Sequence, residues 1–480
     1  MKFIFFIFLF IITFNILAQP PSKFYTRIGG NGYDVGYDVK QTLDNGYIIT
    51  GSTSSMGVGN TDMYLMKLDS MGQIKFQRTF GNANNDIGKS VIQLLDSSYV
   101  IVGYTNSIGF GGYDIFLVKA DKYGDLIWQK TIGGTDWDFA NSLQQTSDGG
   151  FIIAGSTYSY GYGNADGYVV KTDANGNITW SKTYGGANDD EFKSVIQTAD
   201  GGYALCGYTK SYGDINGDAW VFKLLTNGDS AWSKNYGGVK EDFGNQIIEH
   251  PNSDLYIAGG TLSFGVSALN GYVLKLNNIG NFNLQILDNT SSSFASFNSI
   301  ALSKRSQNII TVIATETFFG FSNQFKIMEV NLNLNYINGT DYGSTSDDEM
   351  YNLISTKDKG YACIGYTNGY GAIGSDVYFF KSDSNLVGSI SICSVPENLL
   401  NNVYINIFPN PISDKINISS DLMIQQNHIE LLDITGREVD IKKIIYKLSD
   451  GHFEIDCGDI NNGTYILKYF NLTKKIVILK

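Results

Sequence analysis

The chain has 480 residues, of which 54 are Gly, 31 Tyr and 29 Phe, and its formal net charge is -13. So acidic a chain is a poor partner for nucleic acid or for an anionic membrane surface. The aromatic content excludes a disordered chain, and the length predicts two or more domains. We therefore expect a folded protein that is rich in short strands and turns.

Residues 1 to 18 have the pattern of a signal peptide. Lys2 precedes an apolar run from Phe3 to Leu17, and Ala18 is the expected last residue before cleavage. The run is short for a membrane span, and no later segment reaches 18 consecutive apolar residues. We therefore expect an exported protein with no transmembrane span in the mature chain.

Residues 19 to 383 consist of sequence repeats. A glycine recurs every 52 residues from Gly29 to Gly237 and again 106 residues later at Gly343, and an Asp follows each of these six glycines by five residues. Self-similarity at one fixed period is typical of repeat architectures. These aspartates, which we call the marker aspartates, are Asp34, Asp86, Asp138, Asp190, Asp242 and Asp348.

Each repeat is predicted to form four strands and no helix. In the third copy these are Phe139 to Thr146, Phe151 to Thr157, Asp166 to Asp173 and Ile178 to Tyr184. Tight turns join the first strand to the second and the third to the fourth, whereas a longer loop joins the second to the third. Four-stranded antiparallel sheets stacked around an axis bury one another's faces, which predicts an all-β fold, the β-propeller.

The second strand occurs seven times, so we predict a seven-bladed propeller. The sixth copy is eroded, because Asn289 replaces the glycine and Phe294 replaces the marker aspartate. The array begins with a single strand, Lys23 to Ile28, and ends after a third strand, Asp376 to Asp383. We expect the N-terminal strand to complete the seventh blade and close the ring, because closure removes both sheet edges.

Aromatic residues recur in the fourth strand, as Phe76, Trp128, Trp180 and Trp232. The segment from Lys171 to Trp180 resembles the tryptophan-docking motif of quinoprotein propellers and, more loosely, the Asp-box of sialidases. Both motifs are structural in their families. The resemblance therefore implies a packing role for these rings and no chemistry.

A linker of residues 384 to 400 leads to a second domain, residues 401 to 480, whose short alternating strands predict a small Ig-like β-sandwich. Phe408 to Pro411, Leu432 to Arg437, Asn462 to Leu467 and Lys474 to Lys480 resemble the type A C-terminal sorting domain of type IX secretion. An Ig-like binding module is the alternative for this domain. The residues that carry the resemblance are Pro409, Asn410, Pro411, Gly436, Gly463, Tyr465, Lys474 and Lys475.

The resemblance implies a route and a partner. In that family the domain directs a folded cargo from the periplasm across the outer membrane, and it is usually cleaved as the cargo is released or attached to the cell surface. It implies the type IX secretion machinery as a partner and a secreted or surface-attached product.

The four cysteines do not have the spacing of a disulfide framework. Cys206 and Cys363 fall in second strands of distant blades, too far apart to pair. A bridge between Cys393 and Cys457 stays open, although small buried side chains are the favoured interpretation.

The repeats offer few groups for catalysis. They contain one histidine, His250, and three arginines, which argues against Ser-His-Asp, Cys-His, zinc and sialidase sites. Two carboxylates suffice for a glycosidase, and Asp189 to Glu191 and Asp347 to Glu349 would supply them. We expect a non-catalytic recognition or adhesion protein. The alternatives are a carboxylate-dependent glycoside hydrolase or lyase and a structural cell-surface spacer.

Ligand-binding loops are predicted at one end of the blades. The loop between the second and third strands and the crossing to the next repeat both emerge there, and such loops carry binding sites more often than tight turns do. Their Gly and Tyr content suits an extracellular glycan, with a protein ligand or mere packing of the rings as alternatives. The tyrosines concerned are Tyr160, Tyr162, Tyr212 and Tyr370.

The marker aspartates enter the innermost strands at the same end, so we expect a ring of carboxylates near the mouth of the central channel. Such carboxylates repel one another unless backbone N–H groups donate to each of them or a cation neutralises them. Ligands that are all oxygen favour Ca²⁺. Recurrence in six blades favours the structural interpretation, and no other cofactor is expected.

Overall fold

The computed structural model describes residues 23–265, 269–287, 293–318, 323–344 and 346–386. In the second domain it describes 391–392, 405–408, 415–420, 429–433, 438–439, 445–449, 452–458, 460–469 and 472–478. All regular elements in these ranges are strands, so they hold no helix of the length and apolarity that a membrane crossing needs. The predicted signal peptide, Cys393, Pro409, Asn410, Pro411 and Gly436 lie outside the described residues.

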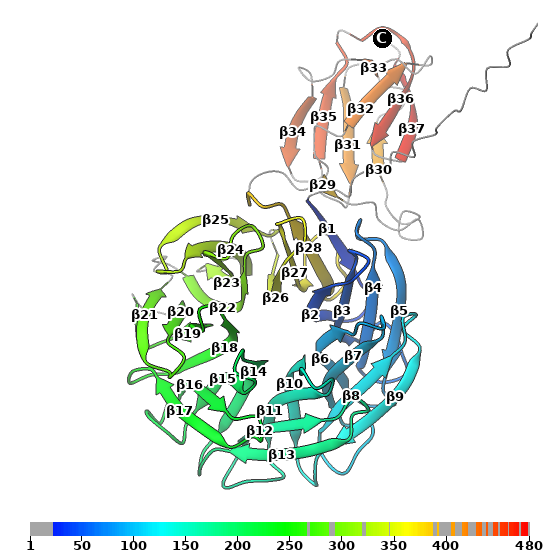
Figure 1. Cartoon of the computed structure of the whole chain (residues 1–480). Helices are drawn as coiled ribbons and strands as arrows, with labels where there is room; N and C mark the ends of the chain where they lie inside the picture. The colour runs from blue at the N-terminus through cyan, green and yellow to red at the C-terminus, as the bar shows by residue number, and fades with distance from the viewer. Residues whose placement is uncertain are drawn as a thin grey trace, which may run out of the picture.

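Seven four-stranded antiparallel units surround a central opening (Figure 1). The innermost strands are β2 (Asp34–Gln41), β6 (Asp86–Gln93), β10 (Asp138–Gln145), β14 (Asp190–Gln197), β18 (Asp242–Glu249), β22 (Ser293–Leu302) and β26 (Asp348–Ser355). The second strands are β3 (Tyr47–Thr53), β7 (Tyr99–Thr105), β11 (Phe151–Thr157), β15 (Tyr203–Thr209), β19 (Leu255–Thr261), β23 (Ile309–Phe318) and β27 (Tyr361–Thr367). The third strands are β4 (Asp62–Leu68), β8 (Asp114–Ala120), β12 (Asp166–Thr172), β16 (Asp218–Leu224), β20 (Asn270–Leu276), β24 (Asn323–Asn331) and β28 (Asp376–Ser382). The outermost strands are β5 (Ile74–Phe80), β9 (Leu126–Ile132), β13 (Ile178–Tyr184), β17 (Ser230–Tyr236), β21 (Phe282–Leu287), β25 (Tyr336–Tyr342) and β1 (Phe24–Ile28).

We number the blades 1 to 7 in this order, so that the N-terminal strand β1 belongs to blade 7. This strand pairs antiparallel with β28, with Tyr25 opposite Phe380. An ion pair of 2.9 Å between Lys23 Nζ and Asp383 Oδ2 lies at the end of the pairing. A short strand, β29 (Ser391–Ile392), adds parallel to β1. The predicted ring closure is therefore confirmed, and the outer edge of the last blade is paired by the start of the chain.

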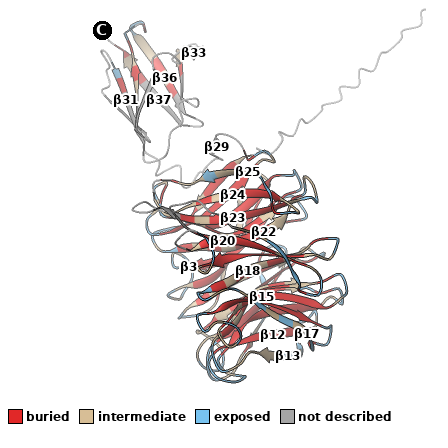
Figure 2. Cartoon of the chain, turned by 90° about the vertical axis from the view of Figure 1, so that its left-hand side faces the viewer, coloured by how far each residue is buried: buried red, intermediate tan, exposed pale blue. Residues whose placement is uncertain are grey.

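The core lies between the blades. One cluster joins Val100, Ile115 and Leu117 of blade 2 to Phe151 and Ile153 of blade 3, and all five side chains are fully buried. The second and third strands are buried on both faces, whereas the outermost strands are half exposed (Figure 2). A single blade could not bury both faces, so the blades stabilise one another.

The recurring aromatic residue of the outermost strand packs on the next blade, as predicted. Trp128 of blade 2 lies against Gly176 in the turn between β12 and β13. Gly176 has φ +75°, and a Cβ there would be 2.8 Å from Trp128 Cη2, so the turn requires glycine on both counts. Trp180 and Trp232 meet Gly228 and Gly280 in the same way.

Each innermost strand contains a β-bulge. In blade 3 the bulged residue is Asn141, between Ala140 and Ser142. A bulge re-aims its side chain, and here the seven bulged side chains all line the central cavity. We call them the bulge ring: Tyr37, Lys89, Asn141, Lys193, Asn245, Asn298 and Tyr351.

The residue after the bulge links neighbouring blades. Ser142 Oγ of blade 3 accepts the backbone N–H of Val195 in blade 4 at 3.1 Å, and Ser299 Oγ of blade 6 accepts that of Leu353 in blade 7 at 3.0 Å. Each of these bonds satisfies an N–H group beside the bulge of the next strand. The bulges therefore both line the channel and tie the blades together.

The second domain contains two four-stranded sheets. One has the order β30-β31-β35-β34 and the other β33-β32-β36-β37. Ile416 and Ile455 from the first sheet and Leu431, Leu467 and Ile476 from the second are buried. Two sheets with buried apolar residues agree with the predicted sandwich, whose Ig-like topology stays a prediction. The strands are β30 (Ile405–Phe408), β31 (Lys415–Ser420), β32 (Ile429–Asp433), β33 (Glu438–Val439), β34 (Ile445–Ser449), β35 (His452–Asp456), β36 (Gly463–Tyr469) and β37 (Leu472–Ile478).

Candidate functional site

Loops and crossings interlock at one end of the blades, which we call the loop face. In blade 3 the N–H of Tyr158, at the start of the loop after β11, donates to the carbonyl of Trp137 in the crossing at 2.7 Å. The N–H of Asp138 donates to the carbonyl of Tyr113 in blade 2 at 2.6 Å. The loop face is therefore built from backbone bonds within and between blades.

The marker aspartates organise these loops. Asp138 accepts hydrogen bonds from the N–H of Gly134 at 2.8 Å, from Ser159 Oγ at 2.7 Å, and from Thr157 Oγ1. All six accept the N–H of the residue four positions earlier, and all are at least 98% buried. They lie beneath the loops and do not line the central cavity. This arrangement agrees with the structural interpretation.

The sequence reasoning missed a second recurring aspartate. It is the first residue of the third strand in five blades, and blade 5 has Asn270 there. Asp114 of blade 2 and Asp138 of blade 3 converge on Gly133, where a Cβ would collide with both carboxylates. The 52-residue period would have revealed it, because the five residues share one position: Asp62, Asp114, Asp166, Asp218 and Asp376.

In each of these pairs the two buried carboxylates repel one another. Burial and the charge of Asp138 raise the pKa of Asp114, and burial and Asp190 do the same to Asp166. Burial raises the pKa of Asp376 to about 6, although Arg27 opposes the shift. In the part of the chain that the structure describes, no group of three or more His, Cys, Asp or Glu side chains is placed to hold a metal. Calcium binding stays the less favoured alternative to the structural interpretation.

The predicted binding tyrosines fall into two groups. The hydroxyls of Tyr160 and Tyr212 donate to the carbonyls of Gly133 and Gly185, each at 2.7 Å, which fixes the loop to the crossing. Tyr162 is 83% exposed on the same loop as Tyr160. Tyr370 instead packs between Tyr25 and Tyr378, with ring centroids 5.0 and 5.4 Å away. The structure therefore places Tyr160 and Tyr162 together and Tyr370 in a packed cluster.

Two equivalent grooves open between blades. The larger, about 770 Å³, lies between blades 2 and 3, and the smaller, about 410 Å³, lies between blades 4 and 5. Tyr160 of the first corresponds to Phe264 of the second, 104 residues later. Besides Tyr160, the larger groove is lined by Phe110, Tyr168, Ile178, Thr131, Ile132, Gly133, Ser181, Lys182 and Thr183.

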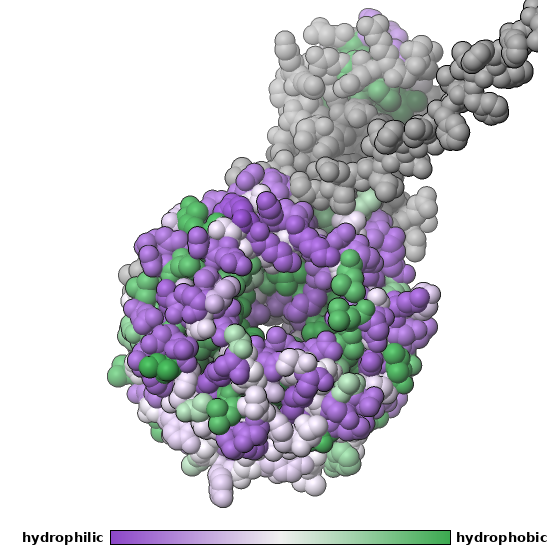
Figure 3. Space-filling model, viewed as in Figure 1, coloured by the Kyte–Doolittle hydropathy of each residue, from purple (hydrophilic) through white to green (hydrophobic). Residues whose placement is uncertain are grey.

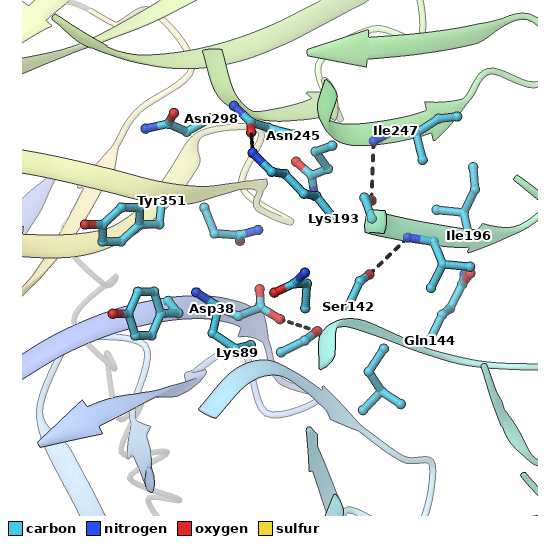
Figure 4. Close-up of a pocket in the computed structure, with 18 of the residues that line it drawn as sticks. Asp38, Lys89, Ser142, Gln144, Lys193, Ile196, Asn245, Ile247, Asn298 and Tyr351 are labelled. Atoms are coloured by element: carbon cyan, nitrogen blue, oxygen red, sulfur yellow. Dashed lines mark hydrogen bonds between the residues drawn. The ribbon is translucent and has the colours of Figure 1, made fainter. Parts of the chain in front are cut away.

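A third hollow is the central channel, a cavity of about 750 Å³ that opens in the middle of the ring (Figures 3 and 4). Lys89 Nζ lies 3.8 Å from the centroid of the Tyr37 ring, and Lys193 Nζ donates to Asn245 Oδ1 at 3.2 Å. Asn141 Nδ2 donates to Glu191 Oε1 at 2.7 Å. Sequence alternation could not assign these side chains to the channel, because the bulge shifts the register by one residue.

The carboxylates considered for glycoside hydrolysis are engaged elsewhere. Asp189 pairs with Lys210 at 3.4 Å, and Glu191 accepts the bond from Asn141. Asp347 accepts the backbone N–H of Asn323, and Glu349 accepts the side-chain amide of Asn323, both at 2.8 Å. Each group therefore has a structural partner.

Comparison with known proteins identifies the C-terminal domain. Residues 406–479 match the model of the secretion system C-terminal sorting domain. Gly463 and Tyr465 lie at the start of β36, and Lys474 and Lys475 lie in β37, its partner strand. The predicted type IX sorting domain is therefore confirmed.

The repeat region has more distant relatives. The regulatory protein FlaEY of Caulobacter vibrioides is 25% identical over an alignment of 275 positions, and the match covers 49% of this chain. The chain spans 28% of that relative's length. Because the match covers so little of that relative, it supports no conclusion about the activity of this chain.

Solved structures resemble the chain at low identity. The Pan2 WD40 domain of Neurospora crassa is 11% identical, with a TM-score of 0.46, over 78% of this chain and 99% of that one. PorZ, a surface component of the type IX secretion system of Porphyromonas gingivalis, is 11% identical with a TM-score of 0.43, over 97% of this chain and 61% of that one. The fold assignment rests on the seven sheets described above. The chain is a seven-bladed β-propeller repeat protein with a C-terminal sorting domain of type IX secretion, exported to the cell surface or secreted.

Proposed function

We propose that the propeller is a non-catalytic recognition module that binds extracellular glycans in the grooves between its blades. The groove between blades 2 and 3 carries this proposal. Phe110 is 64% exposed and Tyr160 45% exposed at its opening. Sugar C–H faces stack on such rings, and hydroxyl and ammonium groups hydrogen-bond the sugar hydroxyls. Thr131 and Ser181 supply hydroxyl groups there, whereas the Lys182 ammonium group pairs with Asp229 at 2.6 Å.

The groove chemistry supports binding without hydrolysis. A glycosidase needs two carboxylates beside the scissile bond. The residues that line the larger groove include no Asp or Glu, and the smaller groove includes only the marker aspartate Asp242. We therefore favour recognition over the glycoside hydrolase alternative.

Repetition supports a multivalent surface. The two grooves have the same position in blades 3 and 5, and Tyr168 and Tyr272 line them at equivalent sites. Two weak sites on one rigid ring bind a polymeric ligand more tightly than either site alone. This arrangement suits adhesion to a polysaccharide.

A glycan array probed with the exported protein, paired with reducing-sugar release on the same glycans, tests the proposal. We expect binding without release. Replacing Phe110 by Ala should weaken binding about fivefold, since a stacked ring contributes roughly 1 kcal/mol. Leu126→Ala is the matched control, because Leu126 is an exposed apolar residue of β9 outside the groove. Release of sugar would favour the hydrolase, and an array without binding would favour the structural spacer.

A further inference from the structure

The bulge ring presents two cations to one cavity. Five of its seven side chains are neutral, and the other two are Lys89 in blade 2 and Lys193 in blade 4. Both extend into the cavity from the innermost strands (Figure 4). The repeats do not require charge at this position, since Asn, Tyr and Lys all occupy it.

No carboxylate in the described part of the chain forms an ion pair with either lysine. Lys89 Nζ lies over the face of Tyr37, and Lys193 Nζ donates to the amide oxygen of Asn245 and lies 4.6 Å from the centroid of the Phe243 ring. Lys40, which also lines the cavity, differs because Asp38 Oδ1 lies 2.5 Å from its Nζ. An ammonium group has three donors, so both Lys89 and Lys193 keep N–H groups for a ligand.

Glu191 is one carboxylate beside two lysines, so it offsets only part of their charge. It lines the cavity, and its Oε1 accepts the side-chain amide of Asn141 at 2.7 Å. Burial lowers the pKa of Lys89 to about 8, Lys193 lowers it further, and Glu191 opposes the shift. The two ammonium groups therefore act on each other across the cavity, and an anion between them would relieve both.

The other polar groups of the ring are already engaged. Asn298 Nδ2 donates to the carbonyl of Met350 and to Thr315 Oγ1, both at 2.9 Å, and the Tyr351 hydroxyl donates to Glu349 at 3.0 Å. Among the side chains of the bulge ring, the only formal charge is therefore that of the two lysines. A cavity of about 750 Å³ has the size of a small-molecule site.

We propose that the central channel binds a small carboxylate ligand, whose carboxylate lies between the ammonium groups of Lys89 and Lys193. A charge-assisted hydrogen bond from each ammonium group holds the carboxylate, and the ring of Tyr37 flanks it on the side of Lys89. The carboxylate comes from a uronic acid sugar or from a simple organic acid. This site is separate from the grooves between blades.

Calorimetric titration of the mature, full-length protein with glucuronate, succinate and glucose tests the proposal. We expect glucuronate or succinate to bind at low salt and glucose not to bind. Tighter binding of glucuronate identifies an acidic sugar as the natural source, and tighter binding of succinate identifies an organic acid. Failure of both acids to bind, or equal binding of glucose, overturns the proposal.

Lysine variants locate the site. Lys89→Gln and Lys193→Gln should each weaken carboxylate binding about tenfold, since each removes one charge-assisted bond. Lys122→Gln is the matched control, because it removes the same charge from the turn between β8 and β9, outside the residues that line the channel and the grooves. Lys89→Arg keeps the charge and should keep binding. Unchanged carboxylate binding in the Lys89→Gln, Lys193→Gln double variant, with an unchanged melting temperature, refutes the site.

The same variants separate this inference from the proposed glycan grooves. Lys89→Gln should leave binding of neutral glycans on the array unchanged, whereas Phe110→Ala should leave carboxylate titration unchanged. A loss of neutral-glycan binding in Lys89→Gln would contradict the independence of the two sites.

Discussion

Blades 3 and 6 form the same sheet with different side chains at two positions. In blade 3 the pairing of β10 with β11 ends at Asp138 opposite Thr157. In blade 6 the equivalent position is Ala295 opposite Glu316 and not the predicted Phe294, because Ala295 lies three residues before the bulge, as Asp138 does. Its N–H also donates to the preceding blade, to the carbonyl of Leu269. The pairing in blade 6 continues past it to Ser293 opposite Phe318. The marker aspartate therefore ends the hairpin and turns the chain into the crossing, because it accepts bonds from the loop. It is not needed for the sheet.

A second difference between the two blades is a reversed ion pair. In blade 3 the buried Lys171 of β12 pairs with Asp148 of the first turn, with 2.9 Å between Nζ and Oδ2. In blade 6 the same strand position holds the buried Glu329, which pairs with Arg305 of the first turn at 2.7 Å. The fold thus needs an ion pair beneath this turn, and the cation can come either from the strand or from the turn.

What blade 6 retains shows what a blade requires. Asn298 keeps the bulge, and Ser299 keeps the bond to blade 7. Ile310 and Val312 keep the buried second strand. The bulge and the interblade core therefore define the blade, and the Gly, Asp, Thr and Ser pattern defines the loop face.

The largest expected effect comes from breaking the reversed ion pair. Glu329→Lys places a buried cation beside Arg305 and removes the acceptor of the Tyr361 hydroxyl, which donates to Glu329 Oε1 at 2.5 Å. The free energy of unfolding should fall by at least about 4 kcal/mol. Urea unfolding measures it. Adding Arg305→Asp should recover most of the loss, because it gives blade 6 the polarity of blade 3, and failure to recover would show that the two polarities are not equivalent.

An intermediate effect is expected at the marker aspartate of blade 3. Asp138→Ala leaves the N–H of Gly134 and the hydroxyls of Thr157 and Ser159 without their acceptor. We expect a loss of about 3 kcal/mol in the free energy of unfolding, measured in urea. The rest of the sheet should keep its hydrogen-exchange protection, since blade 6 forms a sheet without this aspartate. Loss of protection throughout blade 3 would contradict the separation of sheet and loop.

The smallest effect concerns Asp114, which is paired with Asp138 between blades 2 and 3. Because its pKa is raised, Asp114 binds more protons in the folded state than in the unfolded state, so its contribution to stability falls as the pH rises through the folded pKa. Asp114→Asn should therefore stabilise the protein at pH 8 by about 1 kcal/mol and flatten the melting temperature between pH 4 and 7. Blade 5 already has an asparagine, Asn270, at the position of Asp114.

Asp148→Asn is the control of opposite sign. The bonds from Thr146 and Lys171 outweigh burial and lower the pKa of Asp148 to about 2. Its contribution is present above pH 4 and is lost as the pH falls toward 2, so this variant should lower the melting temperature at pH 7. A lower melting temperature of Asp114→Asn at pH 8 would contradict the proposed repulsion between the paired carboxylates.

The sequence by itself determined the number of blades, the four strands of each, and the closure by the N-terminal strand. The period of 52 residues is visible in the sequence alone. The seventh repeat lacks a fourth strand, so the single strand from Lys23 to Ile28 was expected at that position, where it pairs. The sequence also determined the type IX sorting domain, because its motifs lie close together along the chain.

Tertiary structure decided the binding surfaces. The bulge at Lys89 breaks the alternation that would assign its face, so its place in the channel emerges only from the pairing of β6 with β7. Tyr370 is packed by Tyr25, a residue from the other end of the propeller that no local pattern brings near. The pair Asp114 and Asp138 meets across two blades at Gly133. Local periodicity fixes strands, whereas contacts between side chains of different blades depend on ring closure, register and bulges, which only the folded chain specifies.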